Sequence, residues 1–214
     1  MSALALVLIA KGYKVSGSDI KNSPRLAKLK NKGIQTFQKQ TCENITILQN
    51  CFRNKILVVI SSAIKEDNNE LIAARKAGLQ IFHRSDLLAS LIKSQPSIAV
   101  AGSHGKTTTS TILTTLLALA DKDPTAIVGG EIPYYKSNAH KGEGQLLIAE
   151  ADESDGSLTK FNASIGIITN IEFEHADYYK DLNELVITMK KFAAKCKTTL
   201  INYDCQNLRK YFKI

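Results

Sequence analysis

The 214-residue sequence has few aromatic residues and no closely spaced cysteine pairs. Both shortages limit the classes of function that it can have. Aromatic residues make up 7% of the chain, and its 28 lysines and arginines are scattered rather than gathered into an aromatic-rich patch. Nucleic-acid interfaces usually show such a patch, so the net charge of +8 favours an anionic small ligand and no nucleic acid is expected. The four cysteines form no C-x-x-C pair and have no histidine at zinc-finger spacing, which predicts a reduced, cytoplasmic protein.

The opening stretch, MSALALVLIA, is too short an apolar run to cross a membrane. It holds about nine such residues, whereas a bilayer-spanning helix needs around 20. A positive residue does not precede it, and a small-x-small cleavage site does not follow it. We therefore interpret it as a buried helix rather than an export signal, and stable membrane insertion is not expected.

The remaining sequence is typical of a globular α/β protein. With 44% hydrophobic and 22% charged residues, it should bury roughly 70% of its unfolded surface. Short apolar strands alternate with helices, which is the pattern of parallel sheets covered by helices. The sequence shows neither a solenoid period nor a low-complexity segment. Gln95-Pro96 interrupts the alternation and predicts two domains, 1–95 and 96–214.

Both domains are expected to consist of alternating elements. In the first we predict helices at 2–11, 24–32, 69–78 and 85–95, and strands at 13–19, 55–63 and 79–84. The first helix should end before Gly12, and the strand at 55–63 should be buried. In the second we predict strands at 97–102, 125–130, 145–151, 164–170 and 198–204, with helices at 107–120, 182–195 and from 207 onward.

The most informative stretch is IAVAGSHGKTTTS, residues 98–110, in which an apolar strand leads into a glycine-rich turn and a helix. Such a turn directs backbone N–H groups and the positive end of the helix at one anion. The strict phosphate-loop pattern has glycine where this sequence has Val100. Lys106 can still reach terminal phosphates, and the Thr107 hydroxyl can bind Mg²⁺. The stretch therefore predicts a phosphate site rather than an ordinary connection with a surface lysine.

A group of carboxylates follows another predicted strand. The segment LLIAEADESDGS places Glu150, Asp152, Glu153 and Asp155 within six residues, at the strand end where open α/β sheets bind ligands. Mg²⁺ is usually held by one or two carboxylates together with substrate phosphates. This group therefore predicts a magnesium site rather than a solvated acidic loop.

A histidine follows the next predicted strand, in the segment TNIEFEHADYY. His175 stands there between Glu174 and Asp177. A lone histidine is more often structural than functional. Because two other strand ends already point to a nucleotide, we expect His175 to contact metal or phosphate.

Taken together and in this order, VAGSHGKTTTS, VGG, SNAHKGEG, LIAEADESD and TNIEFEHADYY resemble the Mur ligase family. The resemblance covers essentially the whole chain, because MSALALVLIAKGYKVSGSD and VVISSAI look like the family's uridine-nucleotide domain. It implies an α/β fold of two parallel-sheet domains: a Rossmann-like UDP-sugar-binding domain at 1–95 and a truncated P-loop ATP-binding domain at 96–214.

The resemblance also implies an activity, the ATP-dependent ligation of L-alanine to UDP-N-acetylmuramate through an acyl phosphate, in peptidoglycan precursor synthesis. Its implied catalytic residues are Lys106, Glu150 and His175. Thr107 and Glu150 would hold one Mg²⁺, and His175 a second. The implied ATP-binding residues are Gly102, Ser103, His104, Gly105, Lys106, Thr107 and Thr108. Asn138 would contact the muramyl end of the sugar nucleotide, and Asp19, Ser61 and Ser62 its uridine diphosphate.

Two alternatives stay open at this point. A sister ligase of the family attaches a preformed peptide to the same nucleotide, and EFEHAD leans towards it, whereas EADESD and SNAH lean towards the alanine enzyme. The chain could also be a non-catalytic nucleotide-binding remnant. The family opens with a strand and a glycine-rich turn before Met1 and extends beyond residue 214. We therefore expect an incomplete ligase that does not ligate alanine alone; its oligomeric state is left open.

Overall fold

The computed structural model describes residues 1–21, 23–53 and 55–212, and it divides into two units, Met1–Leu87 and Leu88–Ile214. Helix α5 (Arg84–Lys93) crosses the division between them. The boundary predicted from Gln95-Pro96 lies just beyond this helix and stays a prediction.

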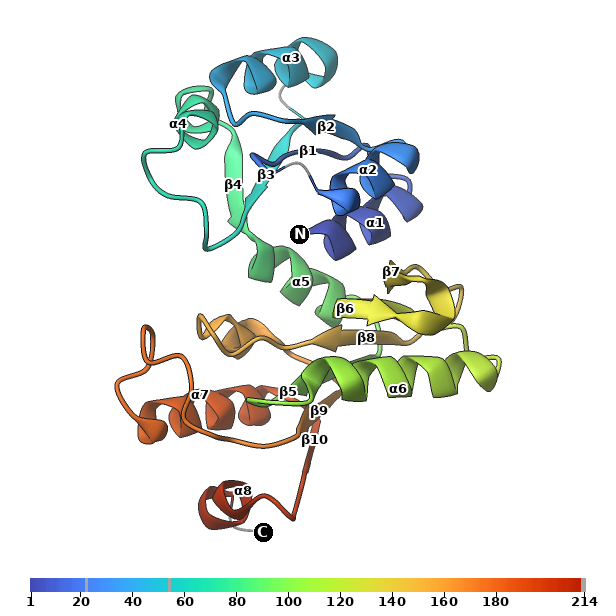
Figure 1. Cartoon of the computed structure of the whole chain (residues 1–214), viewed down its shortest axis with the longest axis vertical. Helices are drawn as coiled ribbons and strands as arrows, with labels where there is room; N and C mark the ends of the chain where they lie inside the picture. The colour runs from blue at the N-terminus through green and yellow to red at the C-terminus, as the bar shows by residue number, and fades with distance from the viewer. Residues whose placement is uncertain (22, 54, 213–214) are drawn as a thin grey trace. The chain divides into compact units, whose positions relative to one another are not determined.

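The second unit is built on a six-stranded sheet (Figure 1). Its strands are β5 (Ser97–Ala101), β6 (Thr125–Ile132), β7 (Ser137–His140), β8 (Leu147–Glu150), β9 (Ile165–Ile168) and β10 (Thr198–Ile201). They lie in the order β10-β9-β5-β8-β6-β7, and all neighbours are parallel except β6 and β7. The helices are α6 (Lys106–Leu119), α7 (Leu182–Lys195) and α8 (Gln206–Tyr211), with short 3-10 turns η1 (Pro133–Tyr135) and η2 (Ser157–Lys160).

The centre of this sheet is buried because its strands are apolar throughout. All five residues of β5 are buried, as are Leu147, Ile148 and Ala149 of β8. Strands covered on both faces read as continuous apolar runs, which explains why SIAVA and LLIA are so apolar. Helix α6 packs against β5, β6 and β8, and α7 packs against β9. Val100 of β5 pairs with Glu150 of β8, so the polar segments that follow these strands start side by side.

The first unit contains two small parallel sheets, β1 with β2 and β3 with β4. The strands are β1 (Ser16–Ser18), β2 (Gln35–Phe37), β3 (Leu57–Ile60) and β4 (Gln80–His83). The helices are α1 (Ser2–Ala10), α2 (Pro24–Asn31), α3 (Cys42–Phe52) and α4 (Asn69–Lys76). One core cluster packs Ile45 of α3 and Ala74 of α4 against Leu79. Each small sheet therefore packs against a helix, α2 against β2 and α4 against β4.

The α/β alternation and the parallel strands expected from the sequence are confirmed. Helix α1 ends as predicted, because Gly12 takes a φ of +86° and its N–H bonds the carbonyl of Ile9. Three elements were not predicted: β2, α3 and β7. The expectation of a buried strand at 55–63 is wrong, because β3 pairs with β4 in a two-stranded sheet and Leu57 is 65% exposed. Within the described ranges, every helix is too short or too polar for a membrane crossing.

Candidate functional site

A glycine-rich turn joins β5 to α6 at the carboxyl edge of the large sheet. Gly102 has a φ of +135° and Gly105 a φ of +79°, which are left-handed conformations that glycine adopts without strain. Gly105 is the N-cap of α6, and the helix begins at Lys106, so Thr107 and Thr108 lie in its first turn. The first N–H groups of a helix have no partners within it and attract anions. The turn thus has the backbone geometry of a phosphate cradle.

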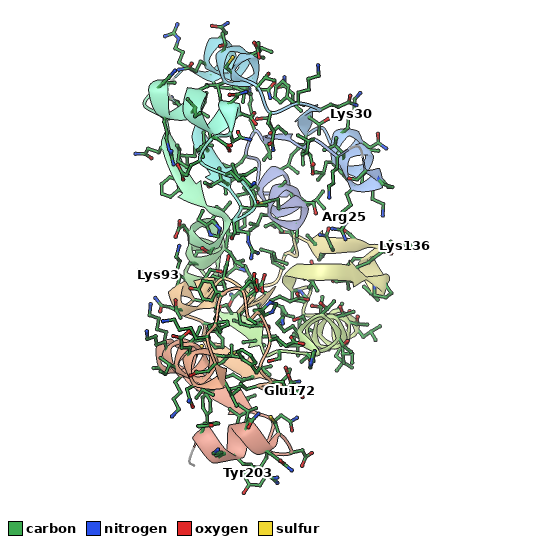
Figure 2. The ribbon with its side chains drawn as sticks, turned by 60° about the vertical axis from the view of Figure 1, so that its left-hand side comes forward. Arg25, Lys30, Lys93, Lys136, Glu172 and Tyr203 are labelled. Carbon is green, nitrogen blue, oxygen red and sulfur yellow. The ribbon has the colours of Figure 1, made fainter. Side chains whose placement is uncertain are left out.

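The loop that follows β9 holds this turn in place. Thr169 Oγ1 and Asn170 Nδ2 donate to the carbonyl of His104, at 2.6 and 3.0 Å, and the His104 N–H donates to Asn170 Oδ1 at 2.8 Å. Ser103 Oγ donates to the carbonyl of Glu172 and accepts from its N–H, both at 2.9 Å. Glu172 is labelled in Figure 2. These bonds join residues more than sixty positions apart, so the cradle is fixed by the fold and not by the turn alone.

Thr169 and Asn170 were not among the residues predicted for the site. Their only signal in the sequence is their position at the end of a strand, in SIGIITN. Their role also explains Gly102, since a Cβ there would lie 2.0 Å from Thr169 Oγ1 and 3.1 Å from the backbone nitrogen of Asn170. Gly102 is therefore required both by its φ and by this close approach.

Lys106 lies over the turn and is held there by three acceptors. Its Nζ donates to the carbonyls of Gly102 at 2.6 Å and Ser103 at 3.1 Å, and to Glu153 Oε1 at 2.9 Å. The lysine side chain is 18% exposed, and the carboxylate of Glu153 is fully buried. Glu153 belongs to the acidic group recognised in the sequence, yet it was not assigned to the site there. The fold makes it the carboxylate that contacts Lys106 of the turn.

Glu150 and Thr107 lie on either side of a pair of glycines in β6. A Cβ on Gly129 would be 2.6 Å from Glu150 Oε2, and one on Gly130 would be 2.7 Å from Thr107 Cγ2. The two glycines therefore leave the room that these side chains occupy. Glu150 Oε1 is buried and has no hydrogen-bond partner in the described part of the chain. A buried carboxylate oxygen without a protein partner suits a hard cation, because Mg²⁺ binds carboxylate oxygens directly.

His175 lies near Glu153 and belongs with it and Lys106 to one cluster of ionisable side chains. Its Nε2 is 3.4 Å from Glu153 Oε1, and ligand atoms of Glu153, Glu174 and His175 lie within 4.8 Å of one another. His175 has a φ of +58°, an uncommon conformation for a residue with a side chain. On the neighbouring side, His104 Nε2 lies 3.3 Å from Glu174 Oε1. The strand-end histidine predicted from the sequence is thus part of the lysine and carboxylate cluster.

Tyr179 fixes the backbone beneath this cluster. Its hydroxyl donates to the carbonyl of Glu153 at 2.6 Å, and its side chain is almost fully buried. Burial raises the pKa of Tyr179 to about 12, so the hydroxyl keeps its proton at physiological pH. It therefore acts as a permanent donor that holds the Glu153 segment against the following loop.

The predicted sugar-nucleotide residues lie at other places. Asn138 is in β7, at about the level of Glu150 but two strands away, roughly 10 Å by the usual strand spacing. In the first unit, Asp19 follows β1 and accepts from the Lys21 N–H at 2.8 Å. Ser61 and Ser62 follow β3, and Ser62 Oγ lies 3.0 Å from His83 Nε2. Asp19 and the two serines follow strands of different small sheets, whereas Asn138 is the second residue of β7.

Comparison with known families assigns both halves of the chain. Residues 1–96 match the family described as "Mur ligase family, catalytic domain", and residues 100–213 match "Mur ligase middle domain". The second match alone covers more than half of the chain. The protein belongs to the Mur ligase family, and the resemblance stated from its motifs is confirmed.

Curated relatives agree with the family and are longer than this chain. The UDP-N-acetylmuramate–L-alanine ligase of Prochlorococcus marinus strain MIT 9303 is 56% identical over 212 residues, which are 99% of this chain and 43% of that protein. The protein of the same name from Synechococcus sp. strain CC9311 is 56% identical over 213 residues, 44% of its length. The chain therefore spans less than half the length of these relatives.

Solved structures show the same fold. The UDP-N-acetylmuramate–alanine ligase of Thermotoga maritima superposes with a TM-score of 0.86 at 28% identity, over 96% of this chain and 47% of that one. A UDP-N-acetylmuramate:L-alanyl-gamma-D-glutamyl-meso-diaminopimelate ligase from Neisseria meningitides superposes with a TM-score of 0.87 at 23% identity, over 99% of this chain and 70% of that one. At that identity the second likeness speaks for the fold alone.

Proposed function

We propose that this chain is the nucleotide-binding part of an ATP-dependent ligase that joins L-alanine to UDP-N-acetylmuramate in peptidoglycan precursor synthesis. One observation carries the proposal. The β5–α6 turn, with Lys106 over it, lies beside the half-buried Glu150, whose Oε1 is buried without a hydrogen-bond partner among the described residues. The names of the relatives that are 56% identical support alanine as the acceptor in preference to a preformed peptide.

The proposed reaction activates a carboxylate as an acyl phosphate. The lactyl carboxylate of the muramic acid attacks the γ-phosphorus of ATP, and ADP leaves. The amine of alanine then attacks the acyl carbon, and phosphate leaves as the amide forms. Lys106 neutralises charge on the transferring phosphoryl group, while the N–H groups of Gly105 to Thr108 hold the phosphates. The reaction needs no nucleophile from the protein, so positioning and electrostatics supply the catalysis.

The donor groups fit Mg²⁺, which we assign as the metal cofactor. Thr107 and Glu150 would hold one ion, because the unpartnered Glu150 oxygen suits an oxygen-seeking cation, and His175 would hold a second. When bound, Mg²⁺ would neutralise charge on the phosphates and orient them for in-line attack. Glu150 and Thr107 themselves would contribute oxygen ligands to the ion.

The first unit is proposed to bind the sugar nucleotide. Asp19, Ser61 and Ser62 would contact the uridine diphosphate, and Asn138 the muramyl end. A domain boundary at 95/96 is supported by the two family matches, because the first ends at residue 96 and the second begins at residue 100. Because ATP and the nucleotide sugar are its substrates, we place the reaction in the cytoplasm.

A chimaera tests this function. The matching 212 residues of the Prochlorococcus marinus enzyme are replaced by this chain, and phosphate release from ATP is measured with UDP-N-acetylmuramate, with and without L-alanine. We expect alanine-dependent release, which is lost in the same chimaera carrying Lys106→Ala. A folded chimaera that releases no phosphate while the parent enzyme does would contradict the proposal.

A further inference from the structure

Glu153 is a buried carboxylate whose role the proposed chemistry leaves unassigned. Its side chain is fully buried, and its Oε1 lies 2.9 Å from Lys106 Nζ and 3.4 Å from His175 Nε2. Its other oxygen, Oε2, is also buried and lacks a hydrogen-bond partner among the described residues. A buried carboxylate is costly unless a cation compensates it. Lys106 is the nearest cation, so the two groups act as one pair.

The contacts of Lys106 show what this pair does. An ammonium has three N–H donors, and here they go to the carbonyls of Gly102 and Ser103 and to Glu153. A phosphate oxygen that takes one donor must displace one of these acceptors or share it. All three bonds have the charged ammonium as their donor, but only Glu153 carries the opposite charge, so Coulomb attraction makes its bond the strongest of the three. The lysine therefore keeps Glu153 and exchanges a carbonyl when a phosphate arrives.

We propose that Glu153 is the counter-ion of the phosphate-loop lysine: it positions Lys106 over the turn and lowers the attraction of the turn for phosphate. This inference rests on the proposed nucleotide-binding function and deepens it. Glu153 brings a negative charge beside the place where the terminal phosphates would lie. Its charge opposes theirs, while its bond to Lys106 keeps the ammonium aimed at them. The carboxylate thus weakens the binding of phosphate and at the same time fixes the position of the lysine ammonium.

The test is a Glu153→Gln substitution, which keeps the shape and the acceptor oxygen of the side chain and removes its charge. We expect ADP to bind this variant about tenfold more tightly, because unit charges a few ångströms apart in a partly buried site change affinity by at least that factor. A merely structural role predicts the opposite, since a loosened site binds its ligand less well. The matched control is Glu143→Gln, which removes an equal charge from a side chain that is 85% exposed.

ADP is titrated by calorimetry into the 214-residue chain and both variants, once with EDTA and once with Mg²⁺. Tighter binding by Glu153→Gln in both buffers, with the control unchanged, supports the inference. Equal or weaker binding in EDTA overturns it, and a loss confined to Mg²⁺ buffer overturns it in favour of Glu153 as a metal ligand. If the unsubstituted chain binds ADP and only the variant effect is absent, the inference alone fails. If that chain binds no ADP, the proposed function fails with it.

A second variant keeps the inference testable if Glu153→Gln does not fold. Removing the carboxylate leaves Lys106 as a buried charge without its partner, whereas the double variant Glu153→Gln/Lys106→Met removes both charges. We expect circular dichroism and urea unfolding to show that the double variant regains the fold and most of the lost stability. A double variant that stays as unstable as Glu153→Gln would show that Glu153 does not serve as the lysine's counter-ion.

Discussion

A single methyl group on Gly129 should disturb the predicted magnesium site without unfolding the protein. In Gly129→Ala the new Cβ would lie 2.6 Å from Glu150 Oε2, whereas an ordinary contact between carbon and oxygen is about 3.3 Å or longer. The carboxylate must therefore move by about 0.7 Å. It is the flexible end of a side chain, so the backbone of β6 and β8 can stay where it is.

This displacement is large for a metal ligand. Functional constellations tolerate about 0.5 Å of error, and a 1 Å misplacement costs on the order of 100-fold in activity. We therefore expect Gly129→Ala to bind the ATP analogue about tenfold more weakly than the unsubstituted chain in the presence of Mg²⁺. In EDTA the two affinities should be equal. We propose that Glu150 binds the cation and the turn binds the phosphates, so titration with and without Mg²⁺ separates the two roles.

Calorimetric titration of a non-hydrolysable ATP analogue, with and without Mg²⁺, measures both quantities on the 214-residue chain. The control is Gly17→Ala, because a Cβ at Gly17 has nothing within 4 Å and its φ is ordinary. It should match the unsubstituted chain in both buffers. If Gly129→Ala kept the full effect of Mg²⁺, the reasoning that places a metal ion on Glu150 would be refuted.

Three further substitutions test other parts of the account. Gly102→Ala should lower stability by about 2 kcal/mol or more, measured by urea unfolding, because the new Cβ meets Thr169 and the backbone of Asn170 and the φ of +135° disfavours a side chain; unchanged stability would contradict this. Asp123→Asn should lower stability by no more than about 1 kcal/mol at pH 7, because the Glu143 N–H and His140 hold the pKa of Asp123 below its ordinary value while solvent screens a side chain that is 44% exposed. The pKa of Asp123 is lower in the folded than in the unfolded protein, so its carboxylate stabilises the fold at every pH above the unfolded pKa of about 3.9. This stabilisation is lost as the pH falls through the folded-state pKa. The free energies of urea unfolding of the two proteins should therefore converge at low pH. Asn138→Ala, in the chimaera described above, should raise the KM for UDP-N-acetylmuramate at least tenfold and leave the KM for ATP unchanged; an equal rise in both would remove Asn138 from the sugar site.

The glycine-rich turn between β5 and α6 could be predicted from the sequence because its signals are local. An apolar strand, two glycines with left-handed φ and a lysine at the start of a helix are all within ten residues of one another. The alternation of strands and helices is local in the same sense. The same reasoning failed for α3, because asparagines and β-branched residues give CENITILQNCF a weak helix propensity. That helix forms because tertiary packing buries Ile45 and Leu48.

The choice of Glu153 among four acidic residues depends on the fold. Asp152 Oδ1 accepts from the Ser154 N–H and Asp155 Oδ1 from the Ser157 N–H, so both aspartates contribute to local turns. Glu153 lies between them and faces inward to Lys106, 47 positions away. Such a pairing has no sequence pattern. The anchoring of the turn by Thr169 and Asn170 was missed for the same reason, since those bonds join distant segments.

The most direct test of the account is nucleotide binding by Lys106→Ala. The unsubstituted 214-residue chain and the variant are titrated with a Mg²⁺-bound ATP analogue, after circular dichroism has shown that both are folded. A charge-assisted bond to phosphate is worth about 3 kcal/mol, so we expect the variant to lose at least 100-fold in affinity. A folded Lys106→Ala variant that binds the analogue as tightly as the unsubstituted chain would contradict the claim that the β5–α6 turn is the phosphate site.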